Sequence, residues 1–348
     1  GHETHVTYDA PTALVAAERF RPEVALLDLG LPGIDGFELA MRLRGTPSFA
    51  RLLIVAVSGY GQASDRERTR AAGFDAHFTK PVALDALLDA FLKHLEQGGL
   101  TGYTRKNIAT GIGAKHVLYN LAEALLDPGD TIAFAVPYWT TYVDIAEIVD
   151  AKMRLMPCPA SQDYKLTPAQ LDAALPGVKV FLFNNPNNPT GMVYTKAEIA
   201  ALAEVLVKHP DVWIICDDIY NRMVFDGVGY HNFVNARPEL RDRVIHVDSL
   251  SKTYGMPGWR VGFMAGPEVV AQAFTTLNSN HITNVPEIVT AAAVAALSGP
   301  QDVPAQRCAE FQAKRDLVMA TMESIPGVLR TIRTRPGGPA RLVERPRA

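Results

Sequence analysis

Cysteine is scarce in this sequence: the chain has only Cys158, Cys216 and Cys308 among its 348 residues. They lie far apart, and no two of them form a C-x-x-C pair. The sequence therefore lacks the cysteine pattern of a disulfide framework or of a zinc site. We expect no bound metal, and we expect the protein to work in the reducing cytoplasm.

Long hydrophobic runs are also missing. No apolar stretch approaches the roughly 20 residues that a membrane-spanning helix needs, and the N-terminus lacks the charged-then-apolar pattern of a signal peptide. Hydrophobic residues make up 48% of the chain and charged residues 20%, which is typical of a soluble globular protein. A chain of 348 residues is longer than one core usually covers, so we expect two domains.

Charge of one sign is concentrated only at the C-terminal end. The net charge is −3, but residues 329–348 carry six basic side chains and one acidic side chain. Basic tails can bind nucleic acid. This tail has no interleaved aromatic residues and no periodicity, so we predict that it is disordered and that the protein has no nucleic-acid partner.

Residues 1–97 alternate short apolar strands with amphipathic helical patterns. Such alternation predicts a parallel sheet with helices on both faces. Asp28, Ser58 and Lys80 each follow a predicted strand, and chemistry is usually found at the carboxyl ends of parallel strands. The predicted strands include His5–Tyr8, Val24–Asp28 and Leu52–Ser58, and the predicted helices include Pro11–Phe20, Phe37–Arg44 and Pro81–Leu95.

This part of the chain resembles the response-regulator receiver domain, which has a flavodoxin-like fold. The resemblance implies that Asp28 accepts a phosphoryl group, that Ser58 senses it, that Lys80 pairs with it ahead of a cis peptide bond, and that a histidine kinase is a partner. The matching motifs are Leu26-Leu-Asp-Leu-Gly-Leu-Pro-Gly-Ile-Asp-Gly36, Val57-Ser-Gly59, Ala72-Gly-Phe-Asp-Ala76 and Lys80-Pro81.

The receiver pattern is incomplete at its start. Receivers begin with a strand that ends in adjacent acidic residues, which hold a divalent cation. Here Glu3 and Asp9 are the only acidic residues before the first long helix, and neither follows an apolar strand. The missing strand would lie inside the sheet, between the first two strands present. We therefore interpret residues 1–97 as a truncated receiver domain and expect little or no phosphorylation of Asp28.

The pattern resets after a Gly-rich linker at residues 98–102. Residues 103–328 form a second, larger α/β unit, in which strands and helices alternate again. The predicted strands are 108–110, 131–135, 152–156, 179–183, 212–216 and 244–247, with helices that begin near Lys115 and span 196–208 and 305–323.

Four loops of this unit carry polar or aromatic residues, and each loop allows a functional and a purely structural interpretation. Gly111–Lys115 precedes a helix and either cradles a phosphate or is a simple turn. Trp139 either covers a planar ring or belongs to the core. Asn184–Gly191 either presents amides to a ligand or builds a rigid turn. The fourth loop follows Ile214–Cys216. Here either Asp217 is a buried carboxylate with a cationic partner, or Asp217 or Asp218 is a helix N-cap.

Lys252 lies among small and hydroxyl residues just after a predicted strand, where a desolvated amine can trap a carbonyl group. Arg260 follows eight residues later. A phosphate cradle, an aromatic plate, an amide, a carboxylate, a lysine and an arginine are together the parts that hold a phosphorylated pyridine aldehyde.

Residues 103–328 resemble the large domain of fold type I aminotransferases, which use pyridoxal 5'-phosphate (PLP), close to the aspartate aminotransferase branch of class I/II. The motifs are Asn-Pro-Thr-Gly, Asp-x-x-Tyr, Ser-x-Ser-Lys and Gly-Trp-Arg-x-Gly, in this order. The implied fold is an α/β sandwich, and the implied reaction moves an amino group from an amino acid to a 2-oxo acid.

The resemblance also implies roles for individual residues. Lys252 would form a Schiff base with the cofactor and move a proton, Asp217 would keep the pyridine nitrogen protonated, and Trp139 would stack on the ring. Asn188 and Tyr220 would bond the phenolate oxygen. The phosphate would be held by Gly113, Ala114, Lys115, Ser249 and Arg260.

Parts of the family pattern are absent. An N-terminal arm and a C-terminal small domain have no counterpart, so we expect impaired activity, and no arginine is assigned to the substrate carboxylate. A homodimer is expected from the resemblance. Two alternatives stay open: a signalling protein that works through Asp28, or a fusion of truncated domains without function.

Overall fold

The computed structural model describes residues 3–31, 33–58, 68–79, 84–282 and 284–325. The chain forms two compact units, Gly1–Leu87 and Leu88–Ala348. Lys80, Pro81 and the tail predicted at 329–348 lie outside the described residues.

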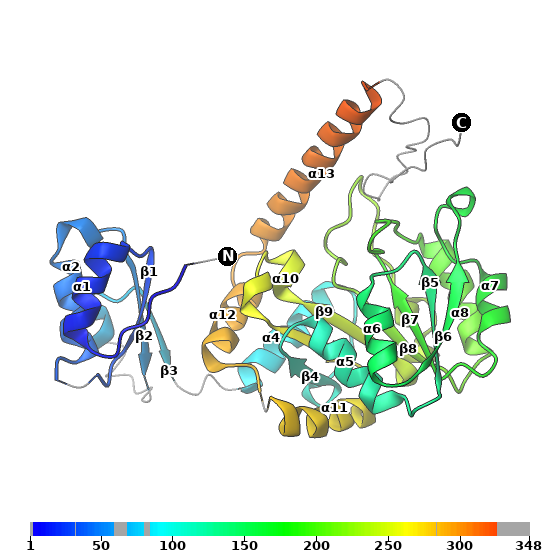
Figure 1. The fold of residues 1–348 in the computed structure, drawn as a ribbon, viewed down its shortest axis with the longest axis horizontal. Coiled ribbons are helices and arrows are strands. Elements are labelled where there is room, and N and C mark those ends of the chain that lie inside the picture. The colour runs from blue at the N-terminus through cyan, green and yellow to red at the C-terminus, as the bar shows by residue number, and fades with distance from the viewer. Residues whose placement is uncertain (1–2, 32, 59–67, 80–83, 283, 326–348) are drawn as a thin grey trace. The chain divides into compact units, whose positions relative to one another are not determined.

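The first unit contains a small parallel sheet. Strands β1 (Val24–Asp28), β2 (Leu53–Ser58) and β3 (Ala76–Thr79) pair in this order. Helices α1 (Ala10–Phe20) and α2 (Gly36–Arg44) lie on the same side of the sheet (Figure 1), and the short 3-10 helix η1 (Pro47–Phe49) precedes β2. The core lies between this side of the sheet and the two helices, and it includes Leu27, Leu39, Leu43, Ile54 and Ala56.

Helix α1 begins where the sequence predicts it, because Asp9 caps its N-terminus. The Asp9 side chain accepts a hydrogen bond from the backbone N–H of Thr12, and proline stands in the first turn. Such a cap satisfies a donor that the helix itself cannot pair.

Two predictions for the first unit are wrong. His5–Tyr8 is not a strand, because a strand needs a neighbour to accept its hydrogen bonds and the expected inner strand is missing from the described part of the unit. Helices do not cover both faces among the described residues of this unit. The uncovered face exposes Val24 and Leu26 by 49% and 48%.

The second unit is built on a seven-stranded sheet. Its strands pair in the order β4-β10-β9-β8-β7-β5-β6, and β10 runs antiparallel to both of its neighbours, whereas the other pairs are parallel. The strand β10 was not expected from the sequence. The strands are β4 (Ile108–Gly111), β5 (Thr131–Val136), β6 (Lys152–Pro157), β7 (Val180–Asn184), β8 (Trp213–Asp217), β9 (Val244–Ser249) and β10 (Gly262–Ala265).

Helices pack around this sheet, and α13 projects away from it (Figure 1). A core cluster joins residues of α5 and α11, among them Val117, Leu121 and Phe274, to Ile245 and Met264 of the sheet. The helices are α4 (Leu84–Gln97), α5 (Ala114–Leu125), α6 (Thr141–Ile148), α7 (Pro168–Ala174), α8 (Lys196–Val207), α9 (Phe233–Ala236), α10 (Leu250–Thr253), α11 (Glu268–His281), α12 (Glu287–Ser298) and α13 (Asp302–Glu323). The 3-10 helices are η2 (Arg105–Asn107), η3 (Ala160–Gln162), η4 (Pro238–Arg243) and η5 (Pro257–Trp259).

Most of the helix α4, which the sequence assigns to the receiver, belongs to the second unit, which begins at Leu88. Its fully buried Phe91 stacks on Phe263 of β10, with ring centroids 4.1 Å apart. The two compact units therefore divide within α4, after Leu87, ahead of the predicted linker at residues 98–102.

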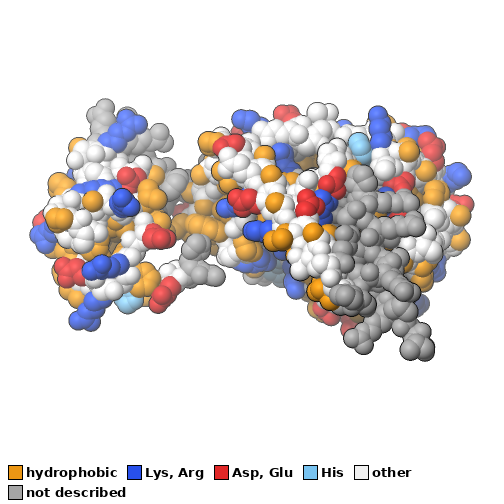
Figure 2. All heavy atoms as spheres, turned by 90° about the horizontal axis from the view of Figure 1, so that it is seen from above, with side chains coloured by type: hydrophobic (Ala, Val, Ile, Leu, Met, Phe, Trp, Pro, Cys, Tyr) orange, Lys and Arg blue, Asp and Glu red, His pale blue; other side chains and the backbone are white. Residues whose placement is uncertain are grey.

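The described residues also show how charge is distributed on the surface and how apolar the helices are. Basic and acidic side chains are interspersed on the face drawn in Figure 2. Among the helices of the described residues, none combines the length and the apolar character needed to cross a membrane.

Phe91→Ala removes a buried ring from the contact between α4 and β10. We expect the free energy of unfolding of the second unit to fall by about 3–5 kcal/mol, measured by denaturant unfolding. Leu84→Ala changes the same helix at a side chain that is 45% exposed, and it should cost less than about 1 kcal/mol. Equal costs for the two variants would contradict the packing of α4 on the second unit.

Candidate functional site

Strand register brings the predicted site residues to one end of the large sheet. Asn184 at the end of β7 pairs with Asp217 at the end of β8, and Asp217 pairs with Val247 of β9. Gly262 at the start of β10 lies opposite both Ser249 and Gly111. The loops that follow β4, β7, β8 and β9 therefore meet at one edge, which is where sheets of this kind bind ligands.

An anion cradle is formed at the N-terminus of α5. Gly113 caps this helix with φ at 91° and no side-chain hydrogen bond, so the N–H groups of the first turn are free of a capping side chain. A helix N-terminus in this state attracts a phosphate. A Cβ atom on Gly113 would lie 2.4 Å from Nη2 of Arg260, so a side chain at this position would push the guanidinium away from the cradle.

Arg260 and Ser249 lie beside this cradle. Nη2 of Arg260 donates to the carbonyl oxygen of Ile112 at 3.2 Å. Ser249 caps the short helix α10, and its Oγ accepts from the backbone N–H of Ser251 at 3.2 Å. A Cβ atom on Gly262 would lie 2.8 Å from the backbone nitrogen of Ala114, which shows how closely β10 approaches the first turn of α5.

Asp217 is buried at the end of β8 with one oxygen satisfied and one not. Its Oδ2 accepts from the hydroxyl of Tyr142 at 2.6 Å, whereas Oδ1 is buried without a hydrogen-bond partner. Desolvation by burial raises the pKa of this carboxyl to about 7, although the hydrogen bond from Tyr142 opposes the rise. A buried, unpaired acceptor of this kind calls for a donor, and a cationic donor would restore the ionised form.

Tyr142 was missed by the sequence analysis. It is fully buried on α6 and lies edge-on to Trp139, with ring centroids 5.7 Å apart. The only local signal was its position three residues after Trp139, which lies just before the N-cap of α6. Its partner Asp217 is 75 residues distant in sequence, so no local pattern connects the two.

Lys252 and the other residues predicted to contact the cofactor ring lie in the loops at this edge of the sheet. Nζ of the exposed Lys252 lies 5.8 Å from the centroid of the Tyr220 ring. Nζ of Lys115 lies 5.1 Å from the centroid of the half-buried Trp139 ring. Asn188 is half-buried, and its backbone N–H donates to Oδ1 of Asn184 at 2.7 Å.

Asn184 fixes the amide-rich loop to the end of β8. Its Nδ2 donates to the carbonyl oxygen of Asp217 at 2.8 Å, while its Oδ1 holds the backbone of Asn188. Asn184 thus builds the turn, which is one of the two roles that the sequence left open for this loop, and it also lies beside Asp217. No helix begins at Asp217 or Asp218, so the N-cap alternative is wrong.

The receiver residues are placed only in part. Asp28 ends β1 and pairs in register with Val57, next to Ser58 at the end of β2. The Oδ1 of Asp28 accepts from the backbone N–H of Gly30 at 2.9 Å. Lys80 lies outside the described residues, so its predicted pairing with the phosphoryl group stays a prediction.

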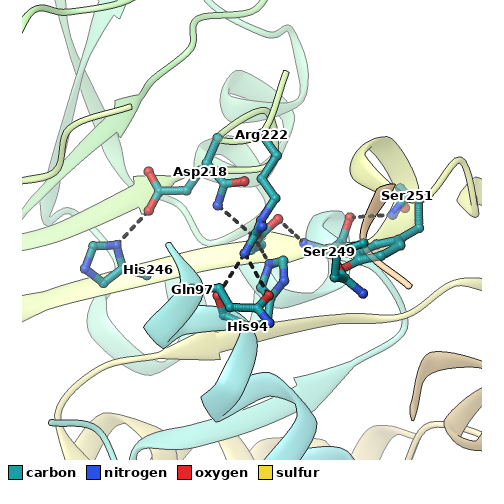
Figure 3. Close-up of polar contacts among 11 residues, drawn as sticks. His94, Gln97, Asp218, Arg222, His246, Ser249 and Ser251 are labelled. Carbon is teal, nitrogen blue, oxygen red and sulfur yellow. Dashed lines mark hydrogen bonds and ion pairs between the residues drawn. The ribbon is translucent and has the colours of Figure 1, made fainter. Parts of the chain in front are cut away.

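A second polar cluster lies on the opposite face of β8 from Asp217. Among the residues that the structure describes, Cys216, Asp218 and His246 are a group whose donor atoms lie within 4.8 Å of one another. The Nδ1 of His246 lies 2.6 Å from Oδ2 of Asp218 (Figure 3). Two ligand atoms of a tetrahedral zinc ion lie about 3.3 Å apart. The shorter distance between His246 and Asp218 is that of a hydrogen bond and not of two zinc ligands.

The pKa of Asp217 predicts a pH-dependent stability. With a folded-state pKa near 7 against an ordinary value of 3.8, the folded chain holds a proton that the unfolded chain has released. The contribution of this group to the free energy of unfolding therefore falls as pH rises from about 4 to about 7, by at most about 1.4 kcal/mol per pH unit. Asp217→Asn cannot titrate, so denaturant unfolding of the cofactor-free protein at pH 5 and pH 8 should show a smaller fall for the variant. Parallel pH profiles would contradict the shifted pKa.

Comparisons with known proteins agree with this geometry. The family model for aminotransferase class I and II matches residues 62–336, and the model for the response regulator receiver domain matches residues 1–92. An aspartate/prephenate aminotransferase from Cereibacter sphaeroides is 40% identical over 258 residues, which are 73% of this chain and 64% of that protein. An aspartate aminotransferase from Rhizobium meliloti is 35% identical over 326 residues, 91% of this chain and 78% of that protein.

A solved structure shows the same fold. The crystal structure of the aspartate aminotransferase from Rhizobium meliloti matches with a TM-score of 0.70 at 32% identity, covering 94% of this chain and 76% of that one. The chain thus spans less than two thirds of the Cereibacter relative and about three quarters of the Rhizobium relatives.

These matches confirm the predicted fold class, the resemblance to a receiver domain at the N-terminal end and the aminotransferase prediction at the level of the family. They give no support to the alternative of a signalling protein that works through Asp28. The chain belongs to the class I and II aminotransferases, a family of PLP-dependent enzymes.

Proposed function

We propose that this chain is a PLP-dependent aminotransferase that takes the amino group of aspartate and passes it to a 2-oxo acid. The observation that carries the proposal is the buried, unpartnered Oδ1 of Asp217 at the sheet edge that also presents Lys252. Aspartate as the amino donor is supported by the names of the relatives from Cereibacter sphaeroides and Rhizobium meliloti.

The residues of the site fit the cofactor at both of its ends. A protonated pyridine nitrogen would supply the donor that Oδ1 of Asp217 lacks, and its positive charge would offset the cost of ionising a buried carboxyl. The phosphate would meet the free N–H groups at the start of α5 and the guanidinium of Arg260. Bound there, PLP supplies an aldehyde for amino groups and a ring that accepts electrons.

Each residue then has a physical task. Asp217 holds a proton at the ring nitrogen, and Tyr142 orients the carboxylate by binding its other oxygen. Nζ of Lys252 takes the α-proton of the substrate and returns it, since the amine lies at the same edge. Tyr220, with a pKa raised by burial and by Asp217, keeps its hydroxyl proton and donates it as a hydrogen bond to the phenolate oxygen.

The remaining residues bind and cover the cofactor. We propose that Gly113, Ala114, Lys115 and Ser249 bind the phosphate with Arg260. Asn188 would donate its amide to the phenolate oxygen of bound PLP, and Trp139 would stack on its ring. Amino-acid and 2-oxo-acid substrates follow from the reaction, whereas the homodimer stays a prediction.

Lys252→Ala tests this function. After incubation with PLP and removal of the unbound cofactor by gel filtration, the wild type should keep an absorbance band of the bound cofactor and transfer the amino group of aspartate. The variant should lose the band and roughly a thousandfold of kcat, because it lacks the amine. Lys152→Ala, an exposed lysine of β6, is the matched control and should behave as the wild type. A band of equal strength in Lys252→Ala would contradict the assignment of Lys252 as the lysine that binds PLP.

A further inference from the structure

A buried histidine outside the predicted site lies against the segment that carries Lys252. His94 on α4 places Nε2 3.1 Å from Oδ2 of Asp248, and the two side chains are only 5% and 4% exposed. Asp248 lies near the end of β9, one residue before Ser249. Figure 3 shows His94 reaching this region from α4. Neither the sequence motifs nor the family matches assign a role to His94.

Asp248 connects two loops of the site. Its Oδ1 accepts the backbone N–H of Ser249 at 2.7 Å, and its Oδ2 accepts from Nδ2 of Asn221 at 2.9 Å. Ser249 is the N-cap of α10, the helix that contains Lys252, and Asn221 directly follows Tyr220. The carboxylate of Asp248 therefore binds both Ser249, just before the helix of Lys252, and Asn221, just after Tyr220.

The same helix also holds the second loop from its backbone. Nη2 of Arg222 donates to the carbonyl oxygen of His94 at 3.1 Å and lies 3.5 Å from Oε1 of Gln97. Figure 3 shows Arg222 directed toward Gln97 and His94. The carboxyl-terminal half of α4 thus contacts both segments that meet at Asp248.

A buried carboxylate keeps its position only while donors surround it. Removing one donor leaves a lone pair of Asp248 unpaired in a dry site, which costs more than the hydrogen bond itself contributes. The carboxylate would then rotate or draw in water, and the backbone of Ser249, which it fixes through Oδ1, would move with it. The helix α10 is only four residues long, so a shift at its N-cap Ser249 reaches Lys252.

We propose that His94 is a positioning residue: its Nε2–H fixes Asp248, and Asp248 in turn holds Ser249 and Lys252 in the geometry that binds PLP. This inference rests on the proposed function. It predicts that the affinity for PLP depends on a hydrogen-bond donor at the position of Nε2, and not on the apolar packing of α4.

The experiment compares PLP affinities by fluorescence titration of the cofactor-free protein. We expect His94→Leu to raise Kd about tenfold, as the loss of one hydrogen bond to a charged group does, and His94→Gln, which returns an N–H near the same point, to stay within about twofold of the wild type. Leu95→Ala removes buried volume from the same helix, so it should lower Tm but leave Kd unchanged.

A double variant separates positioning from general packing. In an Asp248→Asn background the charge that His94 serves is gone, so adding His94→Leu should change Kd by less than about twofold. If His94→Leu does not fold, His94→Asn takes its place, because its shorter amide does not reach Oδ2, and the same tenfold rise is expected.

The outcomes distinguish the two proposals. If the wild type binds no PLP, the proposed function fails. If the wild type binds PLP and His94→Leu, or His94→Asn in its place, binds it equally well, the function stands and the role of His94 is overturned. The role is also overturned if Leu95→Ala weakens binding as much as His94→Leu, or if the effects of His94→Leu and Asp248→Asn are simply additive.

Discussion

The buried carboxylate of Asp217 is the constraint on which the site depends. Desolvation raises its pKa to about 7, and Tyr142 satisfies only one of its two oxygens. Three features keep this group in place. The ends of β7, β8 and β9 are aligned by the strand register, the amide of Asn184 donates to the carbonyl oxygen of Asp217, and Tyr142 donates to its carboxylate. The free oxygen gives the edge of the sheet a preference for a cationic donor.

The same edge is organised through hydrogen bonds that span long stretches of sequence. The carboxylate of Asp248 is hydrogen-bonded to His94, which is 154 residues away in sequence, and to Asn221, which is 27 residues away. Through these contacts α4 becomes part of the support for the lysine segment, although its sequence reads as the last helix of a receiver. The chain divides into its compact units inside α4 because Phe91 and His94 pack within the second unit.

The sequence predicts the residues that carry local motifs, and it predicts less where partners are distant. Lys252, Asp217 and Gly113 each sit in a short pattern of turn and strand residues, so they could be named before the structure. Tyr142 and His94 could not, because their roles depend on partners that only the fold brings near. The strand β10 was missed because it follows a turn-rich segment directly. His5–Tyr8 was predicted as a strand because apolar and polar residues alternate in it, but among the described residues no strand pairs with it.

The central claim, that Lys252 at this edge holds PLP, is tested most directly by covalent trapping. Protein incubated with PLP is reduced with borohydride, which fixes the cofactor on the amine that bears it, and the modified peptide is found by mass spectrometry after proteolysis. The account predicts one phosphopyridoxyl group on the peptide that contains Lys252. Label on Lys115, or label spread over exposed lysines with Lys252 unmodified, would contradict it.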